Sequence, residues 1–229
     1  MALLRGLKDE DWQKPTLARA WRVRDVAAHL LETQLRRLSG HRDGQRLTPD
    51  RPLIDFINHL NATWIALAQR FSPRVIVDLL DVTGHTFAAF IATLPLHERA
   101  YIPVSWAGEN ESENWMDIGR EYTEWWHHQM QIRDAVGAPL LLDARWFAPL
   151  LELSVRAIRP PVPLRFVVDE YSFALGPDGA PAATVRTDAD SAWRLLYNAL
   201  SREEIAARVI IEGDVDAAGA VLDTRSVMV

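Results

Sequence analysis

Hydrophobic residues recur at every third or fourth position through most of the first 158 residues, which is the spacing of amphipathic helices. After a short first helix, the pattern predicts helices over residues 22–40, 52–71, 74–94, 116–136 and 140–158. Gly137 follows residues 116–136 directly, and glycine commonly ends a helix at such a position. The first part of the chain is therefore predicted to be a helical bundle.

The pattern changes after residues 159–163, a proline-rich stretch that we interpret as a linker. Alternating and β-branched residues then predict strands at 164–168, 171–175 and 182–186, with a hairpin turn at 176–179. Helices are predicted at 188–200 and 217–222, on either side of a short apolar run at 209–211. The predicted fold class is α+β, with a helical domain at 1–158 and a small α+β domain at 159–229.

Composition narrows the range of functions. The chain has 31 acidic residues against 25 lysines and arginines, a net charge of −6, so a general nucleic-acid binder is not expected. It has no run of 18 apolar residues and no signal-peptide core near Met1, so we expect a cytoplasmic protein without a membrane partner. It contains no cysteine, which excludes disulfides and a cysteine nucleophile. Any thiol chemistry must therefore use the sulfur of a small molecule.

The clearest candidate for chemistry is the pair Glu124 and His128, which a helix would place one turn apart on the same side. His127 points to nearly the opposite side. Two protein ligands do not make a tight metal site, and His29 is the best-placed third candidate on another helix. Two imidazoles and a carboxylate suit a catalytic zinc ion, and also nickel, cobalt or iron. The helical wheel places His29 at the edge of an apolar face, so an ordinary boundary histidine is the alternative.

Three further residues are candidates for a pocket. Trp125 suits a core or groove wall better than a cofactor platform. Trp106 lies in the predicted loop 101–114, which would form one wall of a pocket. Arg225, near the C-terminal end, would hold a substrate carboxylate through paired hydrogen bonds, with a plain surface arginine as the alternative.

Three segments together resemble one protein family. Residues 21–31 read Trp-Arg-Val-Arg-Asp-Val-Ala-Ala-His-Leu-Leu, and residues 124–137 combine the Glu-x-x-x-His pair with Ile-Arg and Ala-x-Gly. With residues 193–229, these segments resemble the DinB-like four-helix bundle proteins, in the branch named for mycothiol-dependent maleylpyruvate isomerase. The C-terminal part of that branch is similar to sterol carrier proteins. The resemblance covers nearly the whole chain, in the right order.

The resemblance implies a DinB-like bundle in which His29, Glu124 and His128 bind a divalent metal, with zinc favoured and nickel as an alternative. It also implies a low-molecular-weight thiol such as mycothiol as co-substrate. We therefore expect isomerase or S-transferase activity on a small anionic electrophile, with Arg225 as the candidate catalytic residue. The residues expected behind the ligands or in the pocket are Gln131, His127, Trp125 and Trp106.

Alternatives to this activity stay open. The family often has aspartate at the position of Gln131, and this departure favours a non-catalytic stress protein that binds a metal or a ligand. A metal-dependent hydrolase that uses no thiol is the other alternative. A monomer and a homodimer are equally compatible with the sequence.

Overall fold

The computed structural model describes residues 1–18, 20–45, 47–104 and 111–223. Its chain packs into two compact units, one made of Met1–Tyr101 with His127–Leu140 and the other of Ile102–Trp126 with Leu141–Val229. Helices dominate the first unit and the second contains a four-stranded sheet, so the predicted α+β class is confirmed. The single helix α5 (Asn114–Val136) contributes to both units. The predicted domain boundary after residue 158 stays a prediction.

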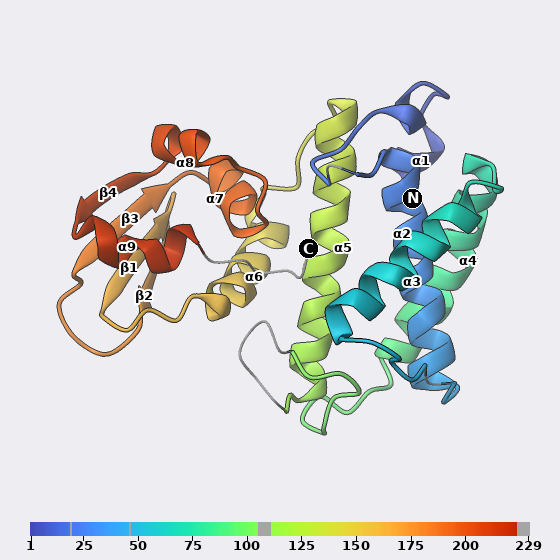
Figure 1. Ribbon diagram of the computed structural model, residues 1–229, viewed down its shortest axis with the longest axis horizontal. Coiled ribbons are helices and arrows are strands. Elements are labelled where there is room, and N and C mark those ends of the chain that lie inside the picture. The colour runs from blue at the N-terminus through green and yellow to red at the C-terminus, as the bar shows by residue number, and fades with distance from the viewer. Residues whose placement is uncertain (19, 46, 105–110, 224–229) are drawn as a thin grey trace. The chain divides into compact units, whose positions relative to one another are not determined.

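The first unit is organised around helix α2 (Val23–Arg37), which a π-helical turn extends through Leu38–Arg42. Helices α3 (Leu53–Ala68) and α4 (Pro73–Ile91) pack against α2, as Figure 1 shows. A short N-terminal helix, α1 (Ala2–Arg5), contacts α4. The α2 side chains that form the core are Val23, Val26, Ala27, Leu30 and Leu31. Several polar side chains of α2 are buried as well: Asp25, His29, Thr33, Gln34 and Arg37.

Asp25 fixes the beginning of α2. Its carboxylate accepts hydrogen bonds from the backbone N–H of Arg22 at 3.0 Å and from the Gln69 side-chain amide at 2.8 Å. Burial alone would raise the pKa of the Asp25 carboxyl, but the hydrogen bonds from Arg22 and Gln69 lower it below the usual value. Asp25 therefore caps the helix as an anion, one turn before His29.

The C-terminal end of α5 is where the sequence predicted it. Gly137 has a φ of +70°, and the N–H of Ala138 donates to the carbonyl of Arg133 at 2.8 Å. This is the arrangement in which glycine ends a helix without steric strain.

The sheet of the second unit has the strand order β2-β1-β3-β4. Strand β1 (Leu164–Val168) pairs antiparallel with β2 (Tyr171–Leu175) and parallel with β3 (Ala183–Thr187). Strand β4 (Ile210–Gly213) pairs antiparallel with β3. The hairpin predicted at 176–179 is therefore wrong: the tight turn lies between β1 and β2, and 176–179 belongs to a crossover. A turn sequence marks a change of direction, but strand pairing decides which strands become neighbours.

Several helices belong to the same unit as this sheet. Helix α6 (Ala144–Ser154) is shorter than predicted, and α7 (Ala189–Leu196) begins at Asp188, whose carboxylate accepts from the N–H of Ser191. Helix α8 (Arg202–Arg208) was not predicted, while α9 (Val215–Leu222) packs on β1, β3 and β4. Among the described residues, no helix combines the length and the hydrophobicity needed to cross a bilayer.

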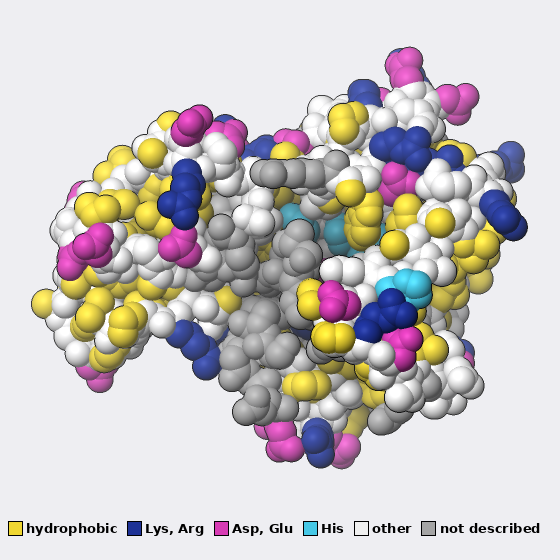
Figure 2. All heavy atoms as spheres, viewed as in Figure 1, with side chains coloured by type: hydrophobic (Ala, Val, Ile, Leu, Met, Phe, Trp, Pro, Cys, Tyr) yellow, Lys and Arg dark blue, Asp and Glu magenta, His cyan; other side chains and the backbone are white. Residues whose placement is uncertain are grey.

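Several large apolar side chains of the first unit lie at its surface. Figure 2 shows hydrophobic side chains over the region of α3 and α4. The exposed ones on these two helices include Ile54, Leu67, Val75, Leu79 and Val82. The core of the unit therefore lies on the α2 side of these helices, where the site residues are found.

Candidate metal centre

Two histidines that are far apart in sequence meet inside the first unit. His29 extends from α2 and His128 from α5, with their ring centroids 4.8 Å apart and their planes at 73°. Both rings are buried, at 5% and 7% exposure. The capped start of α2 and the uninterrupted helix α5 hold their backbones in place.

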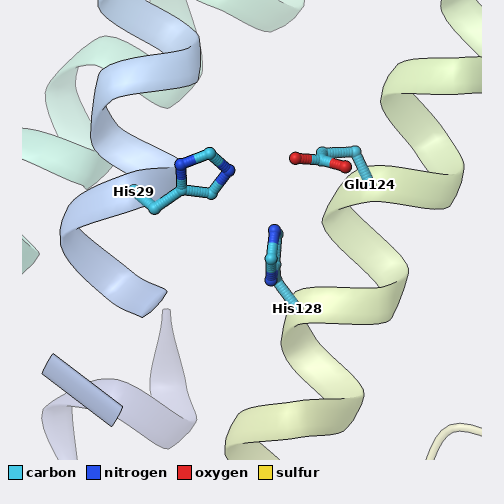
Figure 3. A group of neighbouring side chains, drawn as sticks. All are labelled: His29, Glu124 and His128. Atoms are coloured by element: carbon cyan, nitrogen blue, oxygen red, sulfur yellow. The ribbon is translucent and has the colours of Figure 1, made fainter. Parts of the chain in front are cut away.

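Glu124 completes the group. It lies one turn before His128 on the same helix, so helix geometry places its carboxylate next to that ring. The possible ligand atoms of His29, Glu124 and His128 all lie within 4.8 Å of one another, and Figure 3 shows the three side chains directed toward a common point. The convergence that the sequence predicted is therefore present. Their role as metal ligands stays a prediction.

The donor set fits a divalent ion. Ligand atoms at about 2.1 Å from a tetrahedral zinc ion lie roughly 3.4 Å from one another. Since no pair of the three exceeds 4.8 Å, small side-chain rotations would bring them to these distances. Two imidazoles with one carboxylate are typical of catalytic sites, in which a fourth position accepts an external ligand.

Trp21 lies against both histidines. Its ring centroid is 4.8 Å from that of His29 and 6.3 Å from that of His128. Sequence reasoning used Trp21 only as part of the motif 21–31 and did not assign it to the site. Its position as the first residue of that motif, one residue before the helix cap, was the available signal.

Gln131 connects the two adjacent histidines of α5. Its side-chain amide oxygen lies 2.7 Å from Nδ1 of His128, and its amide nitrogen lies 2.9 Å from Nε2 of His127. All three side chains are buried. His127 faces away from the ligand cluster on the helical wheel, yet Gln131 reaches it because residues three and four positions apart are neighbours on a helix.

A buried charge cluster occupies the preceding turns of α5. Arg120 donates to Asp117 at 2.9 Å and to Glu121 at 2.6 Å, and Asp117 is fully buried. Burial would lower the pKa of the Arg120 guanidinium, but the carboxylates of Glu121 and Asp117, with a smaller effect from Glu124, raise it. Arg120 therefore keeps a fixed positive charge one turn before Glu124. Sequence reasoning missed this cluster because each of its residues alone is typical of a solvated helix face.

Three more residues were predicted to belong to the site or its pocket: Trp125, Trp106 and Arg225. Trp125 is half-buried, whereas its neighbour Trp126 is 2% exposed and packs on Phe147 and Trp193. Trp106 and Arg225 lie outside the described residues, so their predicted roles stay predictions.

Two solved structures share the fold of this chain. The chain is similar in fold to the crystal structure of the mycothiol-dependent maleylpyruvate isomerase, with a TM-score of 0.61 and 14% sequence identity over 93% of this chain and 88% of the other. It is also similar to a histidine-to-alanine mutant of that enzyme, with a TM-score of 0.55 and the same identity and coverage. Among curated proteins, no significant match is found.

The family assignment comes from the sequence comparison. The family model described as the mycothiol maleylpyruvate isomerase N-terminal domain matches residues 1–133, which include His29, Glu124, His128 and Gln131. This match spans more than half of the 229 residues. The chain therefore belongs to the family of the mycothiol maleylpyruvate isomerase N-terminal domain.

Proposed function

We propose that this protein is a metal-dependent enzyme that uses a low-molecular-weight thiol, such as mycothiol, to isomerise or conjugate a small anionic electrophile. His29, Glu124 and His128 would hold the divalent ion, with zinc favoured and nickel as an alternative. The observation that carries the proposal is the convergence of these three donors from two helices on one point. Family membership supports the thiol as co-substrate.

Three ligands leave one position for an outside donor, and a divalent ion there would lower the pKa of a thiol bound to it. The thiolate is the nucleophilic form of a thiol. The chain has no cysteine, so the protein itself offers no competing thiolate to the ion or to the electrophile. This composition supports the use of a borrowed thiol.

The chain's own residues would define the geometry around the reacting thiol. Glu124 contributes a carboxylate and the two histidines are neutral ligands, so the protein places a single negative charge in the ligand set. Trp21 packs against the ring of His29. Arg225 is proposed to bind a substrate carboxylate through paired hydrogen bonds.

In an isomerisation, the thiolate sulfur would form a bond to one carbon of an electron-poor double bond, and the π electrons would move onto the neighbouring carbonyl. Rotation about the resulting single bond and departure of the same thiolate would give the trans product and return the thiol. In a transferase, protonation of the adduct would instead retain the carbon–sulfur bond. Product mass therefore distinguishes the two reactions.

The proposal is tested with metal-free protein to which one equivalent of zinc or nickel is added. Maleylpyruvate is the test substrate because the similar solved structures carry that name. We expect cis-to-trans conversion or a thiol adduct only when both the metal and mycothiol are present. His128→Ala should abolish this conversion, whereas the matched control His85→Ala, which removes an exposed histidine on α4, should retain it.

Two results would contradict the proposal. Turnover that is unchanged when mycothiol is omitted would show that the thiol is not a co-substrate. Full activity after complete removal of the metal would show that the three converging residues serve another purpose. Hydrolysis of an activated ester without thiol would instead support the hydrolase alternative.

A further inference from the structure

Gln131 lies between two buried histidines and contacts one nitrogen of each. The contacts join its Oε1 to Nδ1 of His128 at 2.7 Å and its Nε2 to Nε2 of His127 at 2.9 Å. Gln131 itself is 4% exposed, and both of its partners are on its own helix. The proposed function uses His128 as a ligand but assigns nothing to Gln131 or His127.

The chemistry of a primary amide determines the direction of these hydrogen bonds. The amide oxygen accepts only, and the amide nitrogen donates only. With the oxygen facing His128, Nδ1 of that ring must carry the proton, so Nε2 is the nitrogen with a lone pair for a metal. With the amide turned over, His128 would have to accept at Nδ1 and carry its proton on Nε2, and it would then be unable to bind an ion through Nε2.

We propose that Gln131 is a positioning residue that holds His128 in the Nδ1–H tautomer, with His127 anchoring the other end of the amide. His127 accepts from the amide nitrogen and so keeps the oxygen turned toward His128. This inference rests on the proposed metal site. It assigns Gln131 a role as a neutral hydrogen-bond acceptor behind the ligand.

Because the amide of Gln131 is uncharged, it affects the basicity of the His128 ring differently from a carboxylate. Metal-bound histidines commonly donate their second N–H to a carboxylate or a carbonyl oxygen, and a carboxylate raises the basicity of the ring more. An amide orients the ring without adding negative charge behind the ion. The two functions of a carboxylate partner, orientation and charge, are therefore separated in this chain, and substitutions can test each of them.

The first measurement uses metal-free wild-type protein with ¹⁵N-labelled histidine, in mildly alkaline buffer where imidazoles are neutral. Two-bond ¹H–¹⁵N correlation spectra distinguish the tautomers. We expect His128 to carry its proton on Nδ1 and His127 to be deprotonated at Nε2, with assignments from His127→Ala and His128→Ala. If the Gln131 side chain only filled space and made no hydrogen bond to His128, this tautomer preference would be absent.

The second measurement is zinc affinity by competition with a chelator. Loss of a hydrogen-bonding partner behind a ligand typically weakens metal binding by about 10- to 100-fold, which we expect for Gln131→Leu. Gln131→Glu should bind zinc at least as tightly as the wild type, because a carboxylate also accepts from Nδ1–H. The far-ultraviolet circular dichroism of each metal-free variant confirms that it is folded.

The outcomes separate this inference from the proposed function. Failure of the wild type to bind either zinc or nickel would overturn both the role of Gln131 and the proposed metal site. A wild type that binds zinc but carries the His128 proton on Nε2 when metal-free would overturn only the role of Gln131. The role of Gln131 alone would also be overturned if folded Gln131→Leu bound zinc with wild-type affinity. It would likewise be overturned if Gln131→Glu bound zinc as weakly as Gln131→Leu.

Discussion

Replacing His128 by alanine is the sharpest test of the candidate metal centre, because it removes one of the three donors that converge within the described part of the chain. An ion that binds only the folded protein stabilises it by about 2.7 kcal/mol when its free concentration is 100 times the dissociation constant. The unfolding entropy of a 229-residue chain is about 0.5 kcal/mol per kelvin. We therefore expect saturating zinc to raise the Tm of the wild type by about 6 °C.

The His128→Ala variant should lose this zinc-dependent increase in Tm. Two remaining donors do not make a tight site, so His128→Ala should show a Tm shift below about 1 °C at the same zinc concentration. The metal-free variant should also be less stable by about 1–3 kcal/mol, because the buried oxygen of Gln131 loses the N–H that it accepts from. The effect of zinc is the difference between two scans of the same variant, so this cost does not obscure it.

Differential scanning calorimetry with and without zinc measures both quantities, and elemental analysis gives the metal content of each purified protein. His85→Ala controls for the loss of any histidine and should keep the full shift, since His85 is exposed on α4. A His128→Ala protein that still carries one equivalent of metal, or that keeps a 6 °C shift, would show that the ligand assignment is wrong.

Three predictions concern the scaffold. The pKa of Asp25 is lowered in the folded state, so its contribution to stability is present above about pH 4 and lost as the pH falls through the folded pKa. Asp25→Asn should therefore cost about 1–2 kcal/mol at neutral pH and flatten the pH dependence of the urea midpoint in acid; parallel curves for the two proteins would contradict this. Trp126→Ala should lower the free energy of unfolding by about 3–5 kcal/mol, because a 2%-exposed ring packed on Phe147 is lost, and a cost below 1 kcal/mol in urea titrations would refute its place in the core. Gly213→Ala should cost about 2 kcal/mol or more, since φ is +102° and a Cβ would collide with the carbonyl oxygen of Ala182; unchanged urea stability would disprove the collision.

Much of the fold could be read from local patterns. The predicted helix at 116–136 lies within two residues of α5 at both ends, and the first two predicted strands coincide with β1 and β2. These elements depend on hydrophobic periodicity and on a helix stop at Gly137, which act over a few residues. Strand pairing depends on contacts between segments that are further apart in the chain. The parallel pairing of β1 with β3 was therefore missed, and a hairpin was predicted at 176–179 instead.

In the candidate site too, some features follow from local sequence and others depend on packing between helices. Glu124 and His128 could be paired from their spacing, because one turn of helix brings them together. His29 was only a boundary position on its wheel until the resemblance to a family supported it, and contact between α2 and α5 decided that its ring meets His128. The packing of Trp21 against these rings could not be worked out from residue spacing, because its partners are on two different helices; only its place at the start of the motif 21–31 marked it.

The sequence by itself determined where most helices and strands form, which residue types are available for chemistry, and that no cysteine is among them, because these depend on residue type and short-range spacing. The tertiary structure alone decided which side chains converge. It brought His29 on α2 to the Glu124 and His128 pair on α5, and it packed Trp21 against both histidine rings. The physical reason is that packing between elements, and not periodicity within one, sets the distances and the burial on which metal binding and hydrogen-bond direction depend.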